Sequence, residues 1–369
     1  MTNAVRLSVD DRVRSALAQG AVVAFSLSGG KDSGAASHAA SEWLDKIGHP
    51  RADRVAIHAD LGRAEWRSTP PLVEATAGRL GLPLMVVRHR KHDMVSRWEA
   101  RFAEGKRRYA QLEIFNLIGP WSSASLRFCT AELKQQVIAP ALQRRFPGRT
   151  IISVVGIRRE ESLNRRLAPI SKPEHRWDRR DGTHLLTWHP VLQWSAAEVF
   201  EHHRLHGLPL HEAYRVYGSS RVSCAFCVMQ SAADQAAAAR AADNGDLLNS
   251  LVDLEARSTF SFQPGRWLAD VAPALLAPSL LAAVAVAKGR SLQRRGLECV
   301  LPKDLRYVAG WPLRAPSLAE AETIVEVRRT ILGHHELSEV FATPADVIGR
   351  FEQLLVEKAE RRLLEGLSA

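Results

Sequence analysis

The feature that most constrains the fold is a pair of adjacent glycines between a strand-like stretch and a helix-like stretch. Residues 21–28 form an apolar run of strand length, which ends at Gly29 and Gly30. Residues 33–48 then follow a helical pattern that closes at a glycine. A turn of this kind brings backbone N–H groups and a helix N-terminus to one point, and this combination binds phosphate.

The alternation of strand and helix patterns continues beyond this turn and predicts the fold class. The order implies a parallel sheet covered by helices on both faces, with its ligand site beyond the carboxyl ends of the strands. We therefore expect an α/β domain of about 190 residues built on a doubly wound parallel sheet. Further strands are expected at residues 54–60, 82–89 and 150–157, and further helices are expected to end near residue 80, to span 94–113 and to span 129–146.

The residues of the turn exclude one phosphate loop and resemble another. A Walker loop needs four residues between its first glycine and its Gly-Lys pair, whereas Gly29, Gly30 and Lys31 are contiguous here. The string Ser28-Gly29-Gly30-Lys31-Asp32-Ser33 instead resembles the PP-loop of ATP pyrophosphatases. That class includes thiouridine, argininosuccinate and GMP synthetases and the sulfonucleotide reductases. The resemblance implies the adenine nucleotide alpha hydrolase-like fold.

The PP-loop resemblance implies that the turn binds the β- and γ-phosphates of ATP with Mg2+, and that attack at the α-phosphorus releases pyrophosphate. The residue types agree with this role. Adjacent glycines allow close backbone approach, Lys31 adds a positive charge, and the hydroxyls of Ser28 and Ser33 add donors. Asp32 would orient the loop or help to hold Mg2+. Lys31, Asp32 and Arg158 are accordingly the expected catalytic residues.

Two later strand ends supply the remaining residues expected to bind ATP. Asp60 and Gly62 lie in "HADLG", at the place where PP-loop proteins contact the adenosine. Gly156, Arg158 and Arg165 lie in "GIRREESLNR", which follows the expected strand at 150–157. Arg158 or Arg165 is expected to meet the α-phosphate.

Three further motifs narrow the resemblance within the PP-loop class. "RFCTAELK", "GIRREES" and "SCAFC" together resemble the phosphoadenosine phosphosulfate reductase-like family over residues 21–229. In that family a cysteine at the "CT..LK" position and a later CxxC pair hold an iron–sulfur cluster. The resemblance implies a [4Fe-4S] cluster on Cys129, Cys224 and Cys227, with Cys299 as the candidate fourth ligand. Zinc is the alternative, because its tetrahedral thiolate sites look the same in sequence.

Two departures separate the chain from true assimilatory reductases. These enzymes commonly carry a tandem cysteine where this chain has Phe128-Cys129, and a C-terminal Glu-Cys-Gly motif where Cys299 is followed by Val300. Their phosphate loop also tends to lack the Lys-Asp pair. The intact loop combined with the cysteine set resembles the DndC-like and SspD-like ATP pyrophosphatases of DNA phosphorothioation.

This narrower resemblance implies that ATP adenylates an acceptor, with DNA as the leading candidate, and that sulfur from a cysteine desulfurase then displaces AMP. Partner subunits of a modification complex are also expected. The formal net charge of +10 agrees with a DNA partner, because each phosphate that is neutralised releases counterions. The alternatives are a sulfonucleotide (PAPS or APS) reductase, a tRNA thiolation enzyme, and a non-catalytic nucleotide-sensing regulator that binds DNA.

The pattern along the chain divides it into three expected parts. These are a PP-loop nucleotide-binding α/β domain at residues 1–193, a cysteine-bearing cluster segment at 194–235 and a helical C-terminal region at 236–369. In the last part, residues 343–365 begin with a capping threonine and a proline, and their apolar residues share one helical face. This pattern indicates a packing helix.

Four histidines after residue 200 could be metal ligands, but their spacing does not favour a metal site. They lie on and after an amphipathic helix without carboxylates at ligand spacing, so packing or solvated roles are expected. These histidines are His202, His203, His206 and His211. Buried positions are similarly favoured for four tryptophans that could otherwise stack on bases, namely Trp121, Trp177, Trp188 and Trp194.

Membrane insertion and secretion are not indicated by the sequence. The longest apolar stretch, residues 267–287, carries Asp270 and two prolines, and the first residues lack the pattern of a secretion signal. Four cysteines are too few for a disulfide framework in a chain of 369 residues. A cytoplasmic location is therefore expected.

Overall fold

The computed structural model describes residues 7–307 and 311–366, and its chain divides into two compact units. The first unit comprises Met1–Val95 and Ser122–Leu247, and the second comprises Ser96–Trp121 and Leu248–Ala369. Each unit has its own core and is described by itself below. Residues 1–6, at the start of the first expected part, lie outside the described residues, as do residues 308–310 and 367–369 of the third part.

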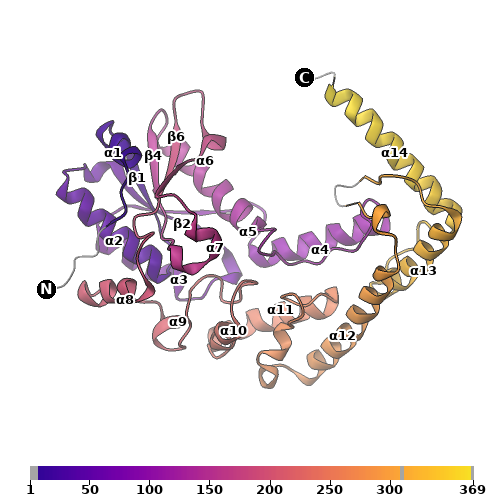
Figure 1. The fold of residues 1–369 in the computed structure, drawn as a ribbon. Helices are drawn as coiled ribbons and strands as arrows, with labels where there is room; N and C mark the ends of the chain where they lie inside the picture. The colour runs from indigo at the N-terminus through magenta and orange to yellow at the C-terminus, as the bar shows by residue number, and fades with distance from the viewer. Residues whose placement is uncertain (1–6, 308–310, 367–369) are drawn as a thin grey trace. The chain divides into compact units, whose positions relative to one another are not determined.

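The first unit is built on a six-stranded sheet with the order β3-β2-β1-β4-β6-β5 (Figure 1). Neighbouring strands run parallel except β5, which is antiparallel to β6 at one edge. The expected doubly wound sheet is therefore confirmed, although the sequence analysis did not assign β5 and β6. The strands span Val22–Ser26 (β1), Arg54–Asp60 (β2), Leu84–Arg88 (β3), Thr150–Val154 (β4), Ser171–Pro173 (β5) and His184–Trp188 (β6).

Both faces of the central strand β1 are buried, which explains its uninterrupted apolar sequence. Val23 and Phe25 pack in one cluster with small residues of helix α2 (Lys31–Lys46), including Ala35 and Ala36. Ala24, between them, points to the other face and packs with residues of α6 (Gln136–Arg145), such as Leu142. This two-sided packing fixes the register and direction of β1, and therefore the position of the turn that follows it.

The strand order places a switch point between β1 and β4. From β1 the chain goes outward through β2 to β3, and it then returns to the other side of β1 as β4. The connections after β1 and β4 diverge at their carboxyl ends, and a crevice at such a point is where open α/β sheets bind ligands. The glycine turn follows β1 and the "GIRREES" segment follows β4, so the fold brings these two motifs together.

The remaining helices of the first unit cover the sheet or connect its strands. Trp188 and Trp194 are buried in the main core cluster, in agreement with the packing role expected for them. These helices are α1 (Asp11–Ala18), α3 (Thr69–Leu80), α5 (Phe128–Thr130), α7 (Leu163–Arg166), α8 (Ala196–Leu205), α9 (Glu212–Arg215) and α10 (Ala232–Ala239), with a π-helical turn at Ala131–Gln135 and 3-10 turns at Arg51–Asp53, Gly62–Ala64, Arg159–Glu161, His175–Trp177 and Ala242–Asn244.

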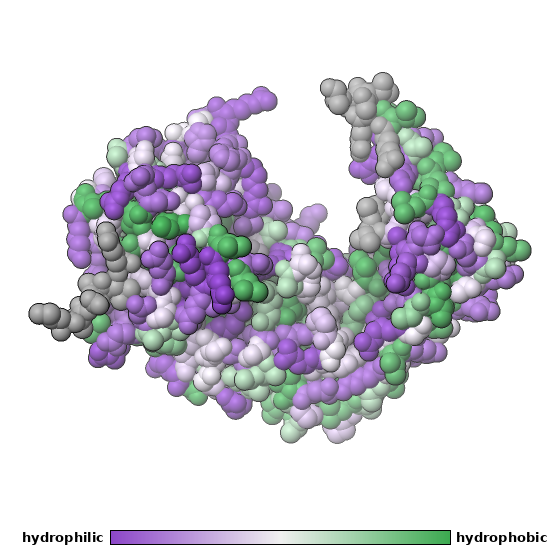
Figure 2. All heavy atoms as spheres, in the orientation of Figure 1, coloured by the Kyte–Doolittle hydropathy of each residue, from purple (hydrophilic) through white to green (hydrophobic). Residues whose placement is uncertain are grey.

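The second unit is helical and has a core of its own. Phe102 and Tyr109 of α4 pack in one cluster with residues of α13 and α14, and Arg328 donates to the Tyr109 carbonyl oxygen at 2.8 Å. The helices are α4 (Met94–Ala110), α11 (Gly245–Ser258), α12 (Pro278–Cys299), α13 (Leu318–His334) and α14 (Pro344–Gly366), with 3-10 turns at Leu268–Asp270, Pro273–Leu275 and Lys303–Leu305. Figure 2 shows green apolar areas on this unit. Apolar residues exposed on its helices include Leu292 of α12 and Val356 of α14.

The packing helix expected near the C-terminus is confirmed as α14. Thr343 accepts the Asp346 N–H at 3.2 Å and so caps the helix, and Val347, Phe351 and Leu354 are buried in the core of the second unit. The units follow different boundaries from the three expected parts, because α4 contributes its apolar face to the C-terminal core. The apolar stretch at 267–287 forms short turns followed by α12, and no helix among the described residues is long and apolar enough to cross a membrane.

Candidate functional site

The turn between β1 and α2 presents a helix N-terminus without a side-chain cap. Gly29 has a φ of +71°, a conformation that favours glycine, and Gly30 occupies the N-cap position. Because Gly30 has no side chain, the N-cap residue itself accepts no N–H of α2, and the Lys31 N–H donates instead to the Tyr214 hydroxyl at 3.2 Å. The backbone dipoles at this end therefore favour an anion at the turn.

Two serines hold the turn in shape. The Ser28 hydroxyl donates to the Ser33 hydroxyl at 3.0 Å, which in turn donates to the Gly30 carbonyl oxygen at 2.9 Å. The Ser28 backbone N–H also donates to the Ser33 hydroxyl at 3.3 Å. In the structure the Ser28 and Ser33 hydroxyls donate within the turn and tie its two ends together, and their expected role as phosphate donors stays a prediction.

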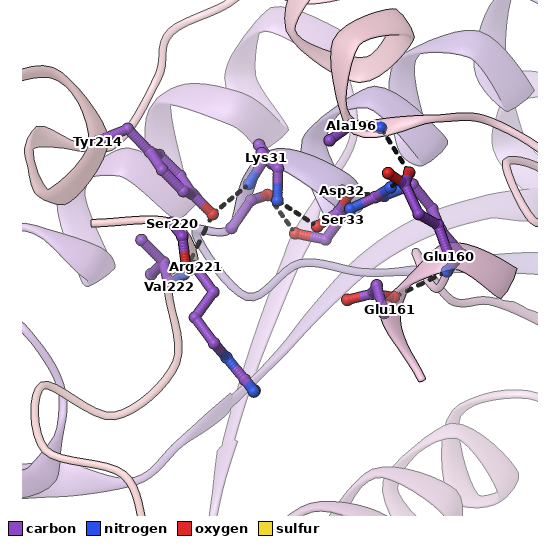
Figure 3. Close-up of polar contacts among 12 residues, drawn as sticks. Lys31, Asp32, Ser33, Glu160, Glu161, Ala196, Tyr214, Ser220, Arg221 and Val222 are labelled. Atoms are coloured by element: carbon purple, nitrogen blue, oxygen red, sulfur yellow. Dashed lines mark hydrogen bonds and ion pairs between the residues drawn. The ribbon is translucent and has the colours of Figure 1, made fainter. Parts of the chain in front are cut away.

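The Asp32 carboxylate, in the first turn of α2, contacts two buried cations (Figure 3). One carboxylate oxygen lies 3.0 Å from Lys31 Nζ, and the other accepts from Arg158 Nε at 2.6 Å. The side chains of Lys31 and Arg158 are each only 5% exposed. Burial opposes the charge of Arg158, but Asp32, together with Glu161 and Glu160, outweighs that effect and raises the pKa of Arg158. The aspartate is therefore the central counter-charge of the turn.

Tyr214 links the turn to the chain segment that precedes the CxxC pair. Its hydroxyl oxygen accepts the Lys31 N–H at 3.2 Å and the Val222 N–H at 3.1 Å (Figure 3). The Lys31 ammonium also lies over two rings, 5.4 Å from the centroid of Tyr214 and 5.6 Å from that of Phe200. These contacts direct Lys31 toward an aromatic pocket and Asp32, a placement that its charge alone did not predict.

Gly156 allows the loop after β4 to touch the start of α2. A Cβ at this position would lie 2.6 Å from the Ser33 backbone nitrogen and closer still to the Asp32 carbonyl group. The atoms in the way belong to the backbone, so they cannot move aside as the end of a flexible side chain could. The two loops at the switch point are therefore in direct backbone contact, and only glycine fits between them.

These segments enclose a cavity of about 500 Å3, which is within the range of small-molecule sites. The turn lines it through Ser28, Gly30, Asp32 and Ser33, and the loop after β4 lines it through Gly156. Five Lys and Arg side chains line the wall, and four carboxylates line it as well, so positive charge is in slight excess; the cations are Arg127, Lys134, Arg165, Arg176 and Arg221, and the carboxylates are Asp32, Glu65, Glu161 and Glu174. Trp177 also lines the cavity. A concave site with a helix N-terminus and several cations suits a ligand with several negative charges.

The "CT..LK" motif borders the same cavity through a π-helical turn. Thr130 and Lys134 lie one turn apart on the path from α5 into the π-helical residues Ala131–Gln135, and both line the cavity. Such π-helical turns are frequent at functional sites. Cys129, next to Thr130, is a partly exposed free thiol. The motif could have identified Lys134 as a site residue, although the sequence analysis did not single it out.

The CxxC pair lies on a turn that its middle residues anchor. Ala225 and Phe226 are fully buried, and the Ala225 N–H donates to the Ala64 carbonyl oxygen at 2.8 Å. The buried Gln230 accepts the Cys227 N–H at 2.7 Å through its side-chain oxygen. Ser223, next to Cys224, lines the cavity. The turn thus places Cys224 directly after a residue of the cavity wall.

Cys224 is within electrostatic reach of both Cys227 and Cys129. Burial raises the pKa of the Cys224 thiol, the neighbouring Cys227 and Cys129 raise it further, and Lys134 acts in the opposite direction. Thiols in this situation lose their protons when a metal binds them, because the metal charge offsets burial and mutual repulsion. The sulfur atoms of Cys129, Cys224 and Cys227 do not form a set within 4.8 Å of one another among the described residues, so the iron–sulfur cluster expected on them, and its zinc alternative, stay predictions. Cys299 is exposed at the end of α12 in the second unit, and its role as fourth ligand stays a prediction.

Comparison with known proteins identifies the family of this site. The model of the phosphoadenosine phosphosulfate reductase domain matches residues 22–229, which is more than half of the chain and contains both the turn and the CxxC pair. The chain belongs to this family. The phosphoadenosine phosphosulfate reductase domain therefore extends from β1 to just beyond Cys227 and includes every element that lines the cavity.

Individual proteins similar to the chain include a phage protein and a fungal enzyme of known structure. A 37.8 kDa uncharacterised protein of Escherichia phage 186 is 26% identical over 243 residues, which cover 57% of this chain and 68% of the phage protein. The crystal structure of a phosphoadenylyl-sulfate reductase from Candida auris, in a phosphate complex, has 13% identity and a TM-score of 0.35, and the match covers 59% of this chain and 97% of that chain.

Within this reductase-family domain, the sequence-predicted residues fall into two groups. Ser28, Gly30, Asp32, Ser33, Gly156 and Arg165 line the cavity. Gly29, Lys31, Asp60, Gly62 and Arg158 are not among the described residues that line it. Lys31 and Arg158 instead flank Asp32, and the Asp60 carboxylate accepts the Gly62 N–H at 2.7 Å within its own loop. The expected direct contact of these five residues with ATP stays a prediction.

His58 is a cavity residue that the sequence analysis placed in a motif but did not select. Its Nδ1 contacts the Leu27 carbonyl oxygen at 2.9 Å and its Nε2 lies 3.2 Å from Glu65, which also lines the cavity. Burial lowers the pKa of His58, but the hydrogen bond and charge of Glu65 outweigh it, so that the pKa is raised above 6.5. The imidazolium form is thus favoured beside the turn.

The ion pair of His58 and Glu65 predicts a pH-dependent contribution to stability. Because the folded pKa of His58 is raised, the contribution is fully present below the unfolded value of 6.5 and is lost as the pH rises through the folded pKa. Glu65→Gln should lower the unfolding free energy by about 1.5–3 kcal/mol at pH 5.5, and by progressively less at higher pH. Urea unfolding at several pH values measures the difference. The exposed Glu74→Gln on α3 is the control, and a pH-independent effect of Glu65→Gln would contradict the assignment.

Proposed function

We propose that the chain is an ATP pyrophosphatase that activates an acceptor for sulfur transfer. The observation that carries the proposal is that one cavity is bordered both by the phosphate-type turn and by the neighbours of two cysteines. Ser28 and Gly30 border it from the turn, while Thr130 and Ser223 border it next to Cys129 and Cys224. Nucleotide chemistry and thiol chemistry would then meet in a single site.

In the proposed complex the turn binds the pyrophosphate end of ATP. The N-terminus of α2, at Gly30, and the hydroxyls of Ser28 and Ser33 would face the β- and γ-phosphates, and Mg2+ would accompany them. Lys134 and Arg165 would supply positive charge to the α-phosphate from the other walls. Both carboxylate oxygens of Asp32 contact cations, which favours an orienting role for Asp32 over direct binding of Mg2+.

The proposed reaction has two steps whose atoms balance. An acceptor oxygen attacks the α-phosphorus, the bond from that phosphorus to the bridging oxygen breaks, and pyrophosphate leaves. A sulfur nucleophile then bonds to the activated atom of the acceptor, and AMP leaves with the former acceptor oxygen. An iron–sulfur cluster on Cys129, Cys224 and Cys227 would supply sulfide-level sulfur at this point. The original donor would be a cysteine desulfurase, whose persulfide sulfur reaches this level with two electrons from a thiol reductant.

DNA is the acceptor that the charge of the chain favours. The formal net charge is +10, and cations such as Arg127 and Arg176 stand at the cavity wall. A phosphate backbone bound in this way would show steep salt dependence. The resemblance of the intact loop and cysteine set to DndC-like and SspD-like proteins supports the same acceptor, within a modification complex of several subunits.

A sulfonucleotide reductase is the second candidate, because the family model that matches the chain is that of phosphoadenosine phosphosulfate reductases. The two reactions differ in their products. The proposed enzyme releases pyrophosphate and leaves AMP from ATP, whereas a reductase releases sulfite from its sulfonucleotide and breaks no α-phosphate bond. The Lys31-Asp32 pair in the turn favours the first reaction.

The experiment that tests the proposal compares these products. The purified protein, supplied with Mg2+, DNA and a sulfide donor, should release pyrophosphate from ATP, and it should release no sulfite from phosphoadenosine phosphosulfate in the presence of thioredoxin. Lys31→Ala should reduce pyrophosphate release by at least about 100-fold. Sulfite release without pyrophosphate release would establish the reductase instead.

A further inference from the structure

Four side chains from two helices converge away from the cavity. His38 and Glu42 lie one turn apart on α2, and His202 lies on α8 with His206 at its C-cap. His38 Nδ1 is 3.2 Å from His202 Nε2, and one ring nitrogen of each of the three histidines lies within 4.8 Å of the others. The described residues contain this group as the one set of three potential ligands that meets this distance.

The Glu42 carboxylate, one turn after His38 on α2, lies beside the three histidines. The two oxygens of Glu42 lie 3.7 Å from His38 Nδ1 and 3.8 Å from His206 Nδ1. The sequence analysis disfavoured a metal because no carboxylate stood at ligand spacing from His202 and His206. The structure supplies that carboxylate from a helix more than 150 residues away in sequence, which no local spacing could reveal.

The two helices are held close enough for a shared ligand set by their small residues and core contacts. Ala35, Ala36 and Ala39 of α2 and Val199 of α8 belong to one buried cluster. Gly34 sits against α8 so closely that a Cβ there would lie 3.1 Å from the His203 ring. The positions of His38 and His202 are therefore fixed by packing on either side of them.

We propose that His38, His202 and His206 bind a divalent transition-metal ion of the zinc class, with Glu42 as the fourth ligand. Three imidazoles and one carboxylate form a tetrahedral donor set that suits zinc. Each pair of ligands is spaced i, i+4, so both members of a pair lie on one helix face. An imidazole ring binds such an ion through the lone pair of a ring nitrogen.

The ion would act on the turn through both helices. α2 begins at Lys31, and His203 of α8 contacts the Lys31 carbonyl oxygen through Nε2 at 2.8 Å. A metal that joins α2 to α8 would therefore fix the helix whose N-terminus forms the turn. This role is structural, and it does not depend on which nucleotide reaction the cavity performs.

Metal content of the full-length protein tests the proposal independently of activity. The protein is stripped with a chelator, given two equivalents of Zn2+, passed through a desalting column and analysed by atomic emission. His202→Ala and His206→Ala should each retain one zinc ion fewer per chain than the wild type. The exposed His184→Ala is the matched control and should retain the wild-type amount. Zinc held by the cysteines is the same in all four proteins and cancels in the comparison.

A second variant tests the metal site at a position where substitution should not disturb the fold. The Glu42 side chain is 44% exposed, so Glu42→Gln should leave the fold intact and weaken zinc binding by about 10- to 100-fold. Circular dichroism checks the fold of every variant. Zinc should also raise the melting temperature of the wild type and leave that of His206→Ala unchanged. Equal zinc retention by the wild type and both histidine variants would overturn the proposal.

Discussion

Replacing Asp32 with alanine is expected to lower the free energy of unfolding by about 3 kcal/mol and to abolish nucleotide turnover. The Asp32 carboxylate is the counter-charge of both Lys31 and Arg158, whose side chains are buried. Without it, two cations remain in a region that has excluded most water. The turn should then lose its shape along with its charge balance, because Lys31 and Arg158 would reorient toward solvent.

Two control variants separate the charge of Asp32 from its contacts in general. Asp32→Asn keeps the size of the side chain and should be destabilising by nearly as much as alanine, because the charge is lost. Glu160→Gln removes another partner of Arg158, but the Glu160 side chain is 56% exposed, so the loss should be below about 1 kcal/mol. Urea unfolding measures all three. Equal stabilities of Asp32→Ala and Glu160→Gln would show that Asp32 does not balance the buried cations.

Gly156→Ala is expected to destabilise the first unit by more than about 2 kcal/mol and to abolish nucleotide binding. The added methyl group would lie 2.6 Å from the Ser33 nitrogen and would press on the Asp32 carbonyl. Relief requires a shift of the loop after β4 or of the first turn of α2. Either movement separates the two motifs that meet at the switch point.

Gly78→Ala, in helix α3 of the same unit, provides the opposite control. No heavy atom lies within 4 Å of a Cβ at that position, and alanine favours a helix over glycine by about 1 kcal/mol. This variant should therefore be as stable as the wild type or slightly more stable, with unchanged nucleotide binding. Thermal unfolding and nucleotide titration of the pair check the contrast. A Gly156→Ala protein that binds nucleotide normally would show that the two loops need not touch.

The fold of the first unit could be predicted largely from its sequence, because its central strands are uninterrupted apolar runs followed by helix patterns. β1 and β2 are buried on both faces and appear in the sequence with nearly their observed limits. β5 has three residues and lies at an edge, so its sequence carries little signal. The division into two units could not be predicted from the sequence either, because it depends on the packing of α4 with helices about two hundred residues later in the chain.

The site could be predicted only where its residues are contiguous. The turn from Ser28 to Ser33 forms one local structure, and its helix setting was predicted correctly. The direction of Lys31 depends on Tyr214 and Phe200, which come from distant helices, and so its burial could not be foreseen. The histidine cluster required His38 and Glu42 to meet α8 across the interface between two helices, a long-range contact without a local motif.

The structure of a complex with an ATP analogue that cannot be cleaved between its α- and β-phosphates tests the central claim most directly. We predict that the β- and γ-phosphates lie at the N-terminus of α2, within hydrogen-bond distance of the Gly30 backbone and the Ser28 and Ser33 hydroxyls. The α-phosphate should then face Lys134 or Arg165 across the cavity. A triphosphate bound elsewhere, with the turn unchanged and empty of phosphate at saturating analogue, would contradict this account.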